Sequence, residues 1–195
     1  PLRILRGFRL MCELNFELEK ETKRLLKNNV DKLSNIAPER IKMEVLKIVH
    51  SQWNSSIWKT YLELQLFQHW SEEKIPFIKF KSKDFFSEKL LKVTPLAKLI
   101  CLLSDEGLSR LRFSKNQVQR CKNLRVWVQK ITHIGLDNLS EDERFQLHID
   151  LEEDLPSLFL FMDERHIDDL SEDERFQLHI DLEEDLPSFI LFLEE

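Results

Sequence analysis

The stretch PLRILRGFRLMCELNF, residues 1–16, decides how the chain folds. Its apolar residues recur at positions 4, 5, 8, 11 and 12, the spacing that places side chains on one face of an α-helix. Arg3, Arg6 and Arg9 recur every three residues, which spreads them over an arc of about 120° on the opposite side. Asn15 tolerates the left-handed conformation that ends many helices. The stretch therefore predicts a helix that ends near Leu14, with a buried apolar face and an exposed basic face.

Composition favours a helical protein of one domain or two small ones. The chain has 195 residues, of which only three are glycine and 33% are charged. No apolar run approaches the ~18 residues of a membrane span, so we expect a soluble, cytoplasmic protein with no membrane partner. Cys12, Cys101 and Cys121 lack the Cys-x-x-Cys spacing of a zinc site. We expect three buried free thiols.

Further helices follow along the chain and predict an all-α fold. Pro38 suits the first turn of a helix, and apolar residues at 41, 45, 48 and 49 continue it with helical spacing. Residues 74–86 instead alternate lysine with apolar residues, which predicts a short extended segment or a loop. Other helices are predicted over Glu17–Lys27, over Ile57–Phe67 with a cap at Ser55 or Ser56, from Pro95, and after a cap at Ser114.

Charge divides the chain into two unequal parts. Residues 1–135 hold 26 lysines and arginines against 14 acidic residues, whereas residues 136–195 hold 3 against 21. A basic helical protein is typical of a polyanion binder, although solvated lysine faces give the same composition. The helix after Ser114 predicts a second basic surface, formed by Lys115, Arg120, Lys122, Arg125 and Lys130.

The acidic part is a tandem duplication. Leu136–Glu164 and Ile167–Glu195 match at a period of 31 residues, and LSEDERFQLHIDLEEDLPS is identical in both copies. Each copy contains the Ser-x-x-Glu pattern of a helix capping box, at Ser140 and again at Ser171. Two copies are too few for a solenoid.

Proline and histidine recur in both copies of the duplication. Pro156 and Pro187 are expected to end the helix that each capping box begins. His148 and His179 each lie in an apolar helical face and lack the spacing of metal ligands, so we expect core or boundary histidines rather than a metal site.

Several motifs, in this order, resemble one family. PLRILRGFRL, ELNF, ETKRLL and SNIAPERIKMEVLKIV are similar to segments of the bacterial class II tRNA nucleotidyltransferases, which add CCA to tRNA 3′ ends, and of their poly(A) polymerase relatives. Residues 1–3 match the end of the family's Glu-Asp-Pro-Leu-Arg motif, and Arg6 and Arg9 match its two following arginines. Residues 38–41 match its Ser-Pro-Glu-Arg-Ile segment, with Ala37 in place of the serine. The resemblance covers about residues 1–162.

The resemblance implies a nucleotide pocket and an architecture. In the family, the arginine that Arg3 matches reads the base of the incoming CTP or ATP, and those that Arg6 and Arg9 match line the same pocket. The resemblance implies that Glu39 and Arg40 brace this pocket, with a helix-end ion pair as the alternative. It also implies a neck over residues 1–70 that binds RNA and nucleotide, a basic helical body over 71–135, and an acidic tail of two 31-residue copies over 136–195.

The family's catalytic head is expected to be absent from this chain. That head bears a Gly-Ser phosphate loop and an Asp-x-Asp pair that holds Mg²⁺, and the sequence shows no such loop or pair. We therefore assign no catalytic residue and no metal ligand here, and expect tRNA, CTP or ATP, and a separate head as partners. The alternatives are a stand-alone RNA-binding module and a non-enzymatic helical interaction protein. The choice among CCA, CC, A and poly(A) addition, the oligomeric state and the role of the second tail copy stay open.

Overall fold

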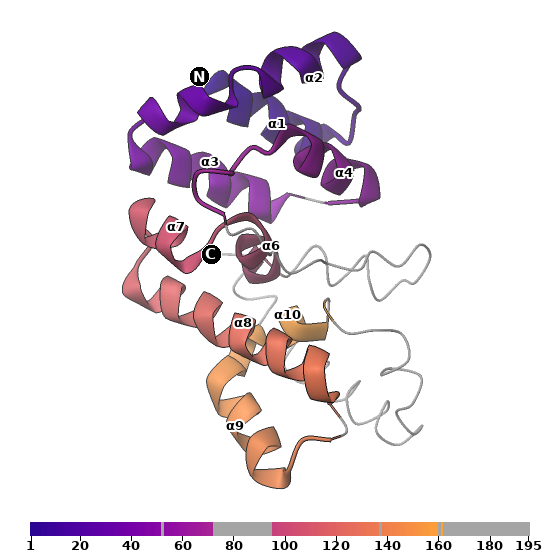
Figure 1. Cartoon of the computed structure of the whole chain (residues 1–195), viewed down its shortest axis with the longest axis vertical. Coiled ribbons are helices and arrows are strands. Elements are labelled where there is room, and N and C mark those ends of the chain that lie inside the picture. Colours follow the sequence, from indigo (N-terminus) through magenta and orange to yellow (C-terminus); the bar gives the residue numbers. More distant parts are fainter. Residues whose placement is uncertain (52, 72–94, 137, 160, 162–195) are drawn as a thin grey trace.

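The computed structural model describes residues 1–51, 53–71, 95–136, 138–159 and 161, and these residues confirm the all-α fold. Helices and two 3₁₀ turns are the regular elements of the described chain (Figure 1). Their bounds are α1 Arg3–Leu14, α2 Lys20–Lys27, the 3₁₀ turn Val30–Asn35, α3 Pro38–His50, α4 Ser55–Leu64, α6 Pro95–Leu102, α7 Asp105–Arg110, α8 Lys115–Ile134, α9 Glu141–Leu151, the 3₁₀ turn Glu152–Asp154 and α10 Leu155–Phe159. The predicted loop at 74–86 and the second acidic copy lie outside these residues.

The opening helix is the predicted one and packs on α3. Leu5 and Phe8 of α1 are fully buried, as are Ile41, Val45 and Ile48 of α3. The apolar face of each helix thus covers that of the other, and burial of such side chains is the main favourable term in folding. In Figure 1, α1 to α4 form one end of the molecule, whereas α8, α9 and α10 lie toward the other.

An aromatic cluster closes the core between α1 and α4. The ring of Phe8 meets that of Trp53 edge-on, with centroids 5.8 Å apart, and lies 6.4 Å from the ring of Tyr61. The Trp58 and Tyr61 rings are 5.3 Å apart. Edge-to-face and tilted arrangements at these distances are those that aromatic quadrupoles favour. These aromatic residues are therefore packing residues.

One predicted helix end is confirmed, and two predicted helix starts are corrected. Helix α1 ends as expected, with Asn15 in the left-handed region at φ 51° and ψ 44°. Helix α2 begins at Lys20 rather than Glu17, because Glu19 is extended, with φ −60° and ψ 148°. Helix α4 is capped by Asn54 rather than by either serine, since the Asn54 side chain accepts a hydrogen bond of 2.9 Å from the Ile57 amide.

The first acidic copy folds with the predicted capping box but a different end. Ser140 and Glu143 form the reciprocal hydrogen bonds that start α9, and Ser114 starts α8 in the same way with Gln117. Helix α9 ends at Leu151, where Glu152 leaves the helical region with φ 41°. Proline therefore does not end this helix: residue 156 lies in the first turn of α10, where its missing N–H costs no helical hydrogen bond.

The expectation of a core or boundary histidine in this copy is wrong. His148 is exposed on α9, because the buried face of that helix is formed by Leu147 and Leu151 instead. The cysteine prediction is confirmed, since Cys12, Cys101 and Cys121 are free and buried.

Residues 1–71 contact the helices from residue 95 onward closely at two places, among others. The Lys98 side chain of α6 is fully buried, and its Nζ donates to the carbonyl oxygens of Val49 at 3.0 Å and Ser51 at 2.7 Å. These carbonyls lie at the C-terminal end of α3, where helices leave acceptors unpaired. Gly107 of α7 lies so close to Trp70 that a Cβ atom there would be 2.0 Å from the Trp70 carbonyl oxygen.

We predict that Lys98 makes stability rise with pH. Burial lowers the pKa of Lys98 to about 7, from 10.5 in the unfolded chain. Between these values the unfolded chain binds more protons, so the contribution of Lys98 to the free energy of unfolding increases with pH, by up to about 1.4 kcal/mol for each pH unit. The measurement is urea unfolding at pH 6.5 and 8.5, comparing the parent chain with Lys98→Met.

The difference between parent and variant isolates Lys98, because all other titrating groups are common to both. Lys59→Met is the matched control, since Lys59 is exposed on α4. The prediction fails if the parent and Lys98→Met change equally in stability between the two pH values.

Candidate nucleotide and RNA binding surface

The arginine face of α1 is held in place by one buried carboxylate. Glu44 of α3 is only 4% exposed and lies between two arginines of α1. Arg6 Nε donates a hydrogen bond of 3.3 Å to Glu44 Oε1, and Arg9 Nε lies 3.3 Å from Oε2 without hydrogen-bond alignment. Arg9 Nη1 also donates to Glu13 at 3.3 Å. Arg6 and Arg9 are therefore oriented by the contact between α1 and α3.

The three arginines differ in how freely they can meet a ligand. Arg3 is exposed, and the Arg6 side chain is 56% exposed with only its Nε engaged among the described residues. The Arg9 side chain is 22% exposed and is shared by two carboxylates. Free guanidinium N–H groups form forked donors that match phosphate and base oxygens. Arg3 and Arg6 thus present most of the unused donors.

Sequence reasoning missed Glu44, although a signal was present. Glu44 falls within the buried row formed by Ile41, Val45 and Ile48, where a carboxylate is out of place unless it is paired. A charged residue on the apolar face of α3, opposite arginines spaced three apart, could have predicted this ion pair.

Among the described residues, no hydrogen bond or ion pair joins Glu39 or Arg40 to the arginines of α1. Glu39 is exposed and forms an ion pair with Arg112, in the turn between α7 and α8. Lys42 strengthens the same junction by donating to the Arg112 carbonyl at 3.0 Å. Arg40 is exposed and has no ion-pair partner within the described part of the chain. Glu39 therefore links α3 to the helices after residue 95, and a bracing role for either residue stays a prediction.

The second basic surface predicted on α8 is largely neutralised, because three of its five cations form ion pairs. Arg120 forms two hydrogen bonds of 2.7 Å to Asp154. Lys130 pairs with Glu143 at 2.9 Å. Arg125 is buried and pairs with Asp105. Lys115 and Lys122 are the cations of this helix that remain exposed without an ion pair among the described residues.

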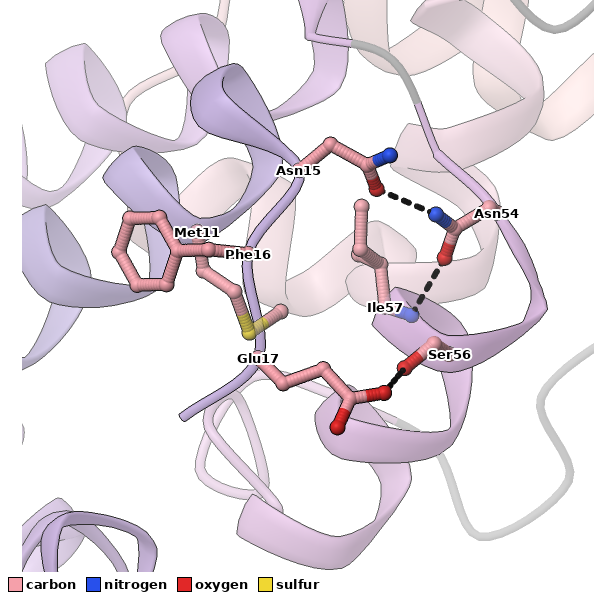
Figure 2. Close-up of a pocket in the computed structure, with 7 residues that line it drawn as sticks. All are labelled: Met11, Asn15, Phe16, Glu17, Asn54, Ser56 and Ile57. Carbon is pink, nitrogen blue, oxygen red and sulfur yellow. Dashed lines mark hydrogen bonds between the residues drawn. The ribbon is translucent and has the colours of Figure 1, made fainter. Parts of the chain in front are cut away.

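A pocket of about 220 Å³ lies at the opposite end of α1 from Arg3 (Figure 2). Its polar groups bind one another: Asn54 Nδ2 donates to Asn15 Oδ1 at 2.5 Å, and Ser56 Oγ donates to Glu17 Oε1 at 3.3 Å. The pocket is lined by Met11, Asn15, Phe16, Glu17, Asn54, Ser56 and Ile57. Since none of these is a predicted nucleotide-binding residue, the pocket and the arginine face are separate features.

The described residues contain neither a candidate metal site nor a candidate membrane span. No group of three or more histidine, cysteine, aspartate and glutamate side chains there could hold a metal ion. No helix there combines the length and the apolar character needed to cross a membrane.

Comparison with known proteins agrees with the resemblance. The sequence model of a family described as the probable RNA and SrmB-binding site of polymerase A matches residues 15–75. The CCA-adding enzyme of Staphylococcus haemolyticus is 29% identical over 121 residues, which are 60% of this chain and 28% of that enzyme. The chain is thus similar, over part of its length, to CCA-adding enzymes and to the RNA-binding region of poly(A) polymerases.

Two further enzymes are similar over comparable portions of the chain. A CCA-adding enzyme of Bacillus cereus is 33% identical over 93 residues, covering 48% of this chain and 21% of the enzyme. The CC-adding tRNA nucleotidyltransferase of Synechocystis is 24% identical over 144 residues, which are 61% of this chain and 35% of that enzyme. The chain thus spans about a third or less of the length of these relatives. No solved structure matches.

We predict that Glu44 stabilises the α1–α3 contact and that Glu13 does not. Glu44→Gln leaves the partly buried Arg9 beside a neutral amide, and we expect the free energy of unfolding to fall by about 1–2 kcal/mol. Glu13→Gln removes the exposed partner of the same arginine and should cost at most about 0.5 kcal/mol. Urea unfolding of both variants measures the difference. Equal losses would contradict a special role for the buried carboxylate.

Proposed function

We propose that this chain is the tRNA- and nucleotide-binding portion of a tRNA nucleotidyltransferase, an enzyme that adds CCA, CC or A to tRNA 3′ ends. The observation that carries the proposal is the arginine face of α1, fixed by a buried glutamate in a chain that is similar to this family. Fixed donors lose little freedom when they bind, and preorganisation of this kind favours selective recognition. A cytoplasmic location belongs to the same proposal.

In this proposal Arg3 and Arg6 contact CTP or ATP. Both are exposed, and the free Nη groups of Arg6 can donate a forked pair of hydrogen bonds to a phosphate or a base oxygen. Arg9 lies on the same face, but Glu13 and Glu44 already share its guanidinium group. Arg9 is therefore proposed to contribute mainly its positive charge, close to the donors of Arg3 and Arg6. Glu39 and Arg40 are proposed to support α3 beneath it.

The proposal assigns no catalytic step to this chain. Nucleotidyl transfer in the family is expected to use Mg²⁺, but the described residues offer no cluster of carboxylates, histidines or cysteines that fits such an ion. We propose that a catalytic head holds the metal, either fused to this chain or separate from it, and that the chain alone binds without polymerising.

In this proposal tRNA contacts the end of the molecule formed by residues 1–71. Exposed cations there include Arg3, Arg6, Arg40 and Lys47. On α8, by contrast, the acidic residues of the first tail copy already pair with the cations. Unpaired cations release counterions when they bind phosphate, and cations held in ion pairs gain much less.

We predict that Arg3→Ala and Arg6→Ala each weaken CTP and ATP binding about tenfold. Loss of one hydrogen bond to a charged group costs about 1.5–3 kcal/mol when the site is complete. Arg6→Lys should not restore binding, since an ammonium group cannot replace the fork. Isothermal titration with each nucleotide is the measurement, and the matched control is Lys122→Ala on α8. An Arg6→Ala variant that binds as well as the control would remove the arginine face from the proposed site.

We predict that tRNA binding is weak and depends steeply on salt. Gel shifts at 50 and 200 mM salt should show a large loss of affinity at the higher concentration, because most of the affinity comes from counterion release. Replacing Arg40 and Lys47 together with alanine should weaken binding at low salt, whereas replacing Lys115 and Lys122 should have little effect. Salt-independent binding, or no binding at low salt, would favour the alternative of a helical interaction protein.

A further inference from the structure

The first acidic copy binds α8 through contacts that its sequence specifies. Glu143 pairs with Lys130 at 2.9 Å, at one end of the interface. At its centre, Asp150 Oδ2 accepts a hydrogen bond of 2.9 Å from Trp127 Nε1. At the other end, Asp154 accepts two hydrogen bonds of 2.7 Å from Arg120.

Apolar residues complete this interface. Leu139, Leu147 and Leu151 of the same copy are buried. Figure 1 shows α9 and α10 lying alongside α8. The α8 face is thus a continuous recognition surface for one acidic, amphipathic helical segment.

The second copy repeats each of these contact residues. Glu174, Leu178, Asp181, Leu182 and Asp185 lie 31 positions after the residues that contact α8 or are buried beside it. The identical stretch spans residues 139–157 and 170–188, so it includes the capping serine and the aspartates at both the centre and the end of the interface. Any difference in affinity between the copies must come from outside this stretch.

We propose that the second acidic copy is an alternative occupant of the α8 face, and that the two copies exchange there within one chain. When the second copy binds, Glu174 faces Lys130 and Asp185 faces Arg120, while the first copy is released. This inference concerns the duplicated tail and is independent of the proposed nucleotide and tRNA sites.

Two physical differences favour the first copy. Its capping serine follows the end of α8 by a few residues, whereas Ser171 is 31 residues farther along the chain. By the three-halves-power dependence of loop closure on length, this difference favours the first copy by about twentyfold. In addition, the fully buried Leu158 is replaced by Phe189, and a larger side chain in a packed site is unfavourable. The first copy is accordingly the one that occupies α8 in the structure.

Cross-linking in the full chain tests the exchange. Lys130→Cys is combined with either Glu143→Cys or Glu174→Cys, the chain is treated with a short bismaleimide, and the linked peptides are quantified in the monomer. The native cysteines should react little with the maleimide. Burial raises the pKa of Cys12 and Cys121 to about 12, and Cys101 is fully buried. We expect linkage to position 143 to dominate and linkage to position 174 to reach about one per cent at most.

Copy-specific variants then shift the balance in predicted directions. Asp154→Ala weakens the first copy and should raise linkage to position 174 at least fivefold, and adding Asp185→Ala should reverse that rise. Phe189→Leu leaves α8 and the first copy unchanged, so it cannot act by unfolding them, and it should also raise linkage to position 174.

Two outcomes would overturn the proposal. One is the absence of linkage to position 174 in the monomer, both with Asp154→Ala and with Phe189→Leu. The other is linkage to position 174 found only in covalent dimers, which would mean that the second copy binds α8 of another chain instead.

Discussion

The packing of α1 on α3 is the contact on which the N-terminal half of the structure depends. Leu5 and Phe8 are buried against Ile41 and Val45, and the one carboxylate in that interface, Glu44, is paired on both oxygens. A buried charge is costly unless partners replace its lost hydration. The α1–α3 contact therefore fixes both the packing of the two helices and the orientation of Arg6 and Arg9, because Glu44 lies within that contact and pairs with both arginines.

Charge compensation organises the other half. Residues 1–135 carry a large excess of cations, but on α8 this excess is met by Glu143, Glu153 and Asp154 of the first acidic copy. Charges in ion pairs are far less available to an external polyanion than exposed ones. The net charge of a segment is thus a poor guide to which of its cations are available to a polyanion, and the exposed, unpaired cations among residues 1–71 are more available than those of α8.

Much of the fold could be predicted from local signals. The start of α3 at Pro38, the end of α1 at Asn15 and the capping boxes at Ser114 and Ser140 all follow from residues within one helical turn of each boundary. The starts of α2 and α4 lie a few residues from their predicted positions, although local residues decide both. The exposure of His148 instead depends on a more distant contact. His148 has apolar neighbours in the sequence, but the face that meets α8 is the one that carries Leu147, so the histidine remains exposed.

The sequence by itself determined the all-α class, the helix boundaries with strong caps, the row of arginines on α1 and the duplication of the acidic tail. These depend on periodicity, on capping and on identity between segments, which can be read along the chain. Only the tertiary structure decided which charges are paired. The partners of Arg120 and Lys98 lie 34 and 47–49 residues away, and no local pattern specifies such contacts. A guanidinium or ammonium group looks the same in a sequence whether it faces solvent, a ligand or a buried carboxylate, and the packing of helices distinguishes these cases.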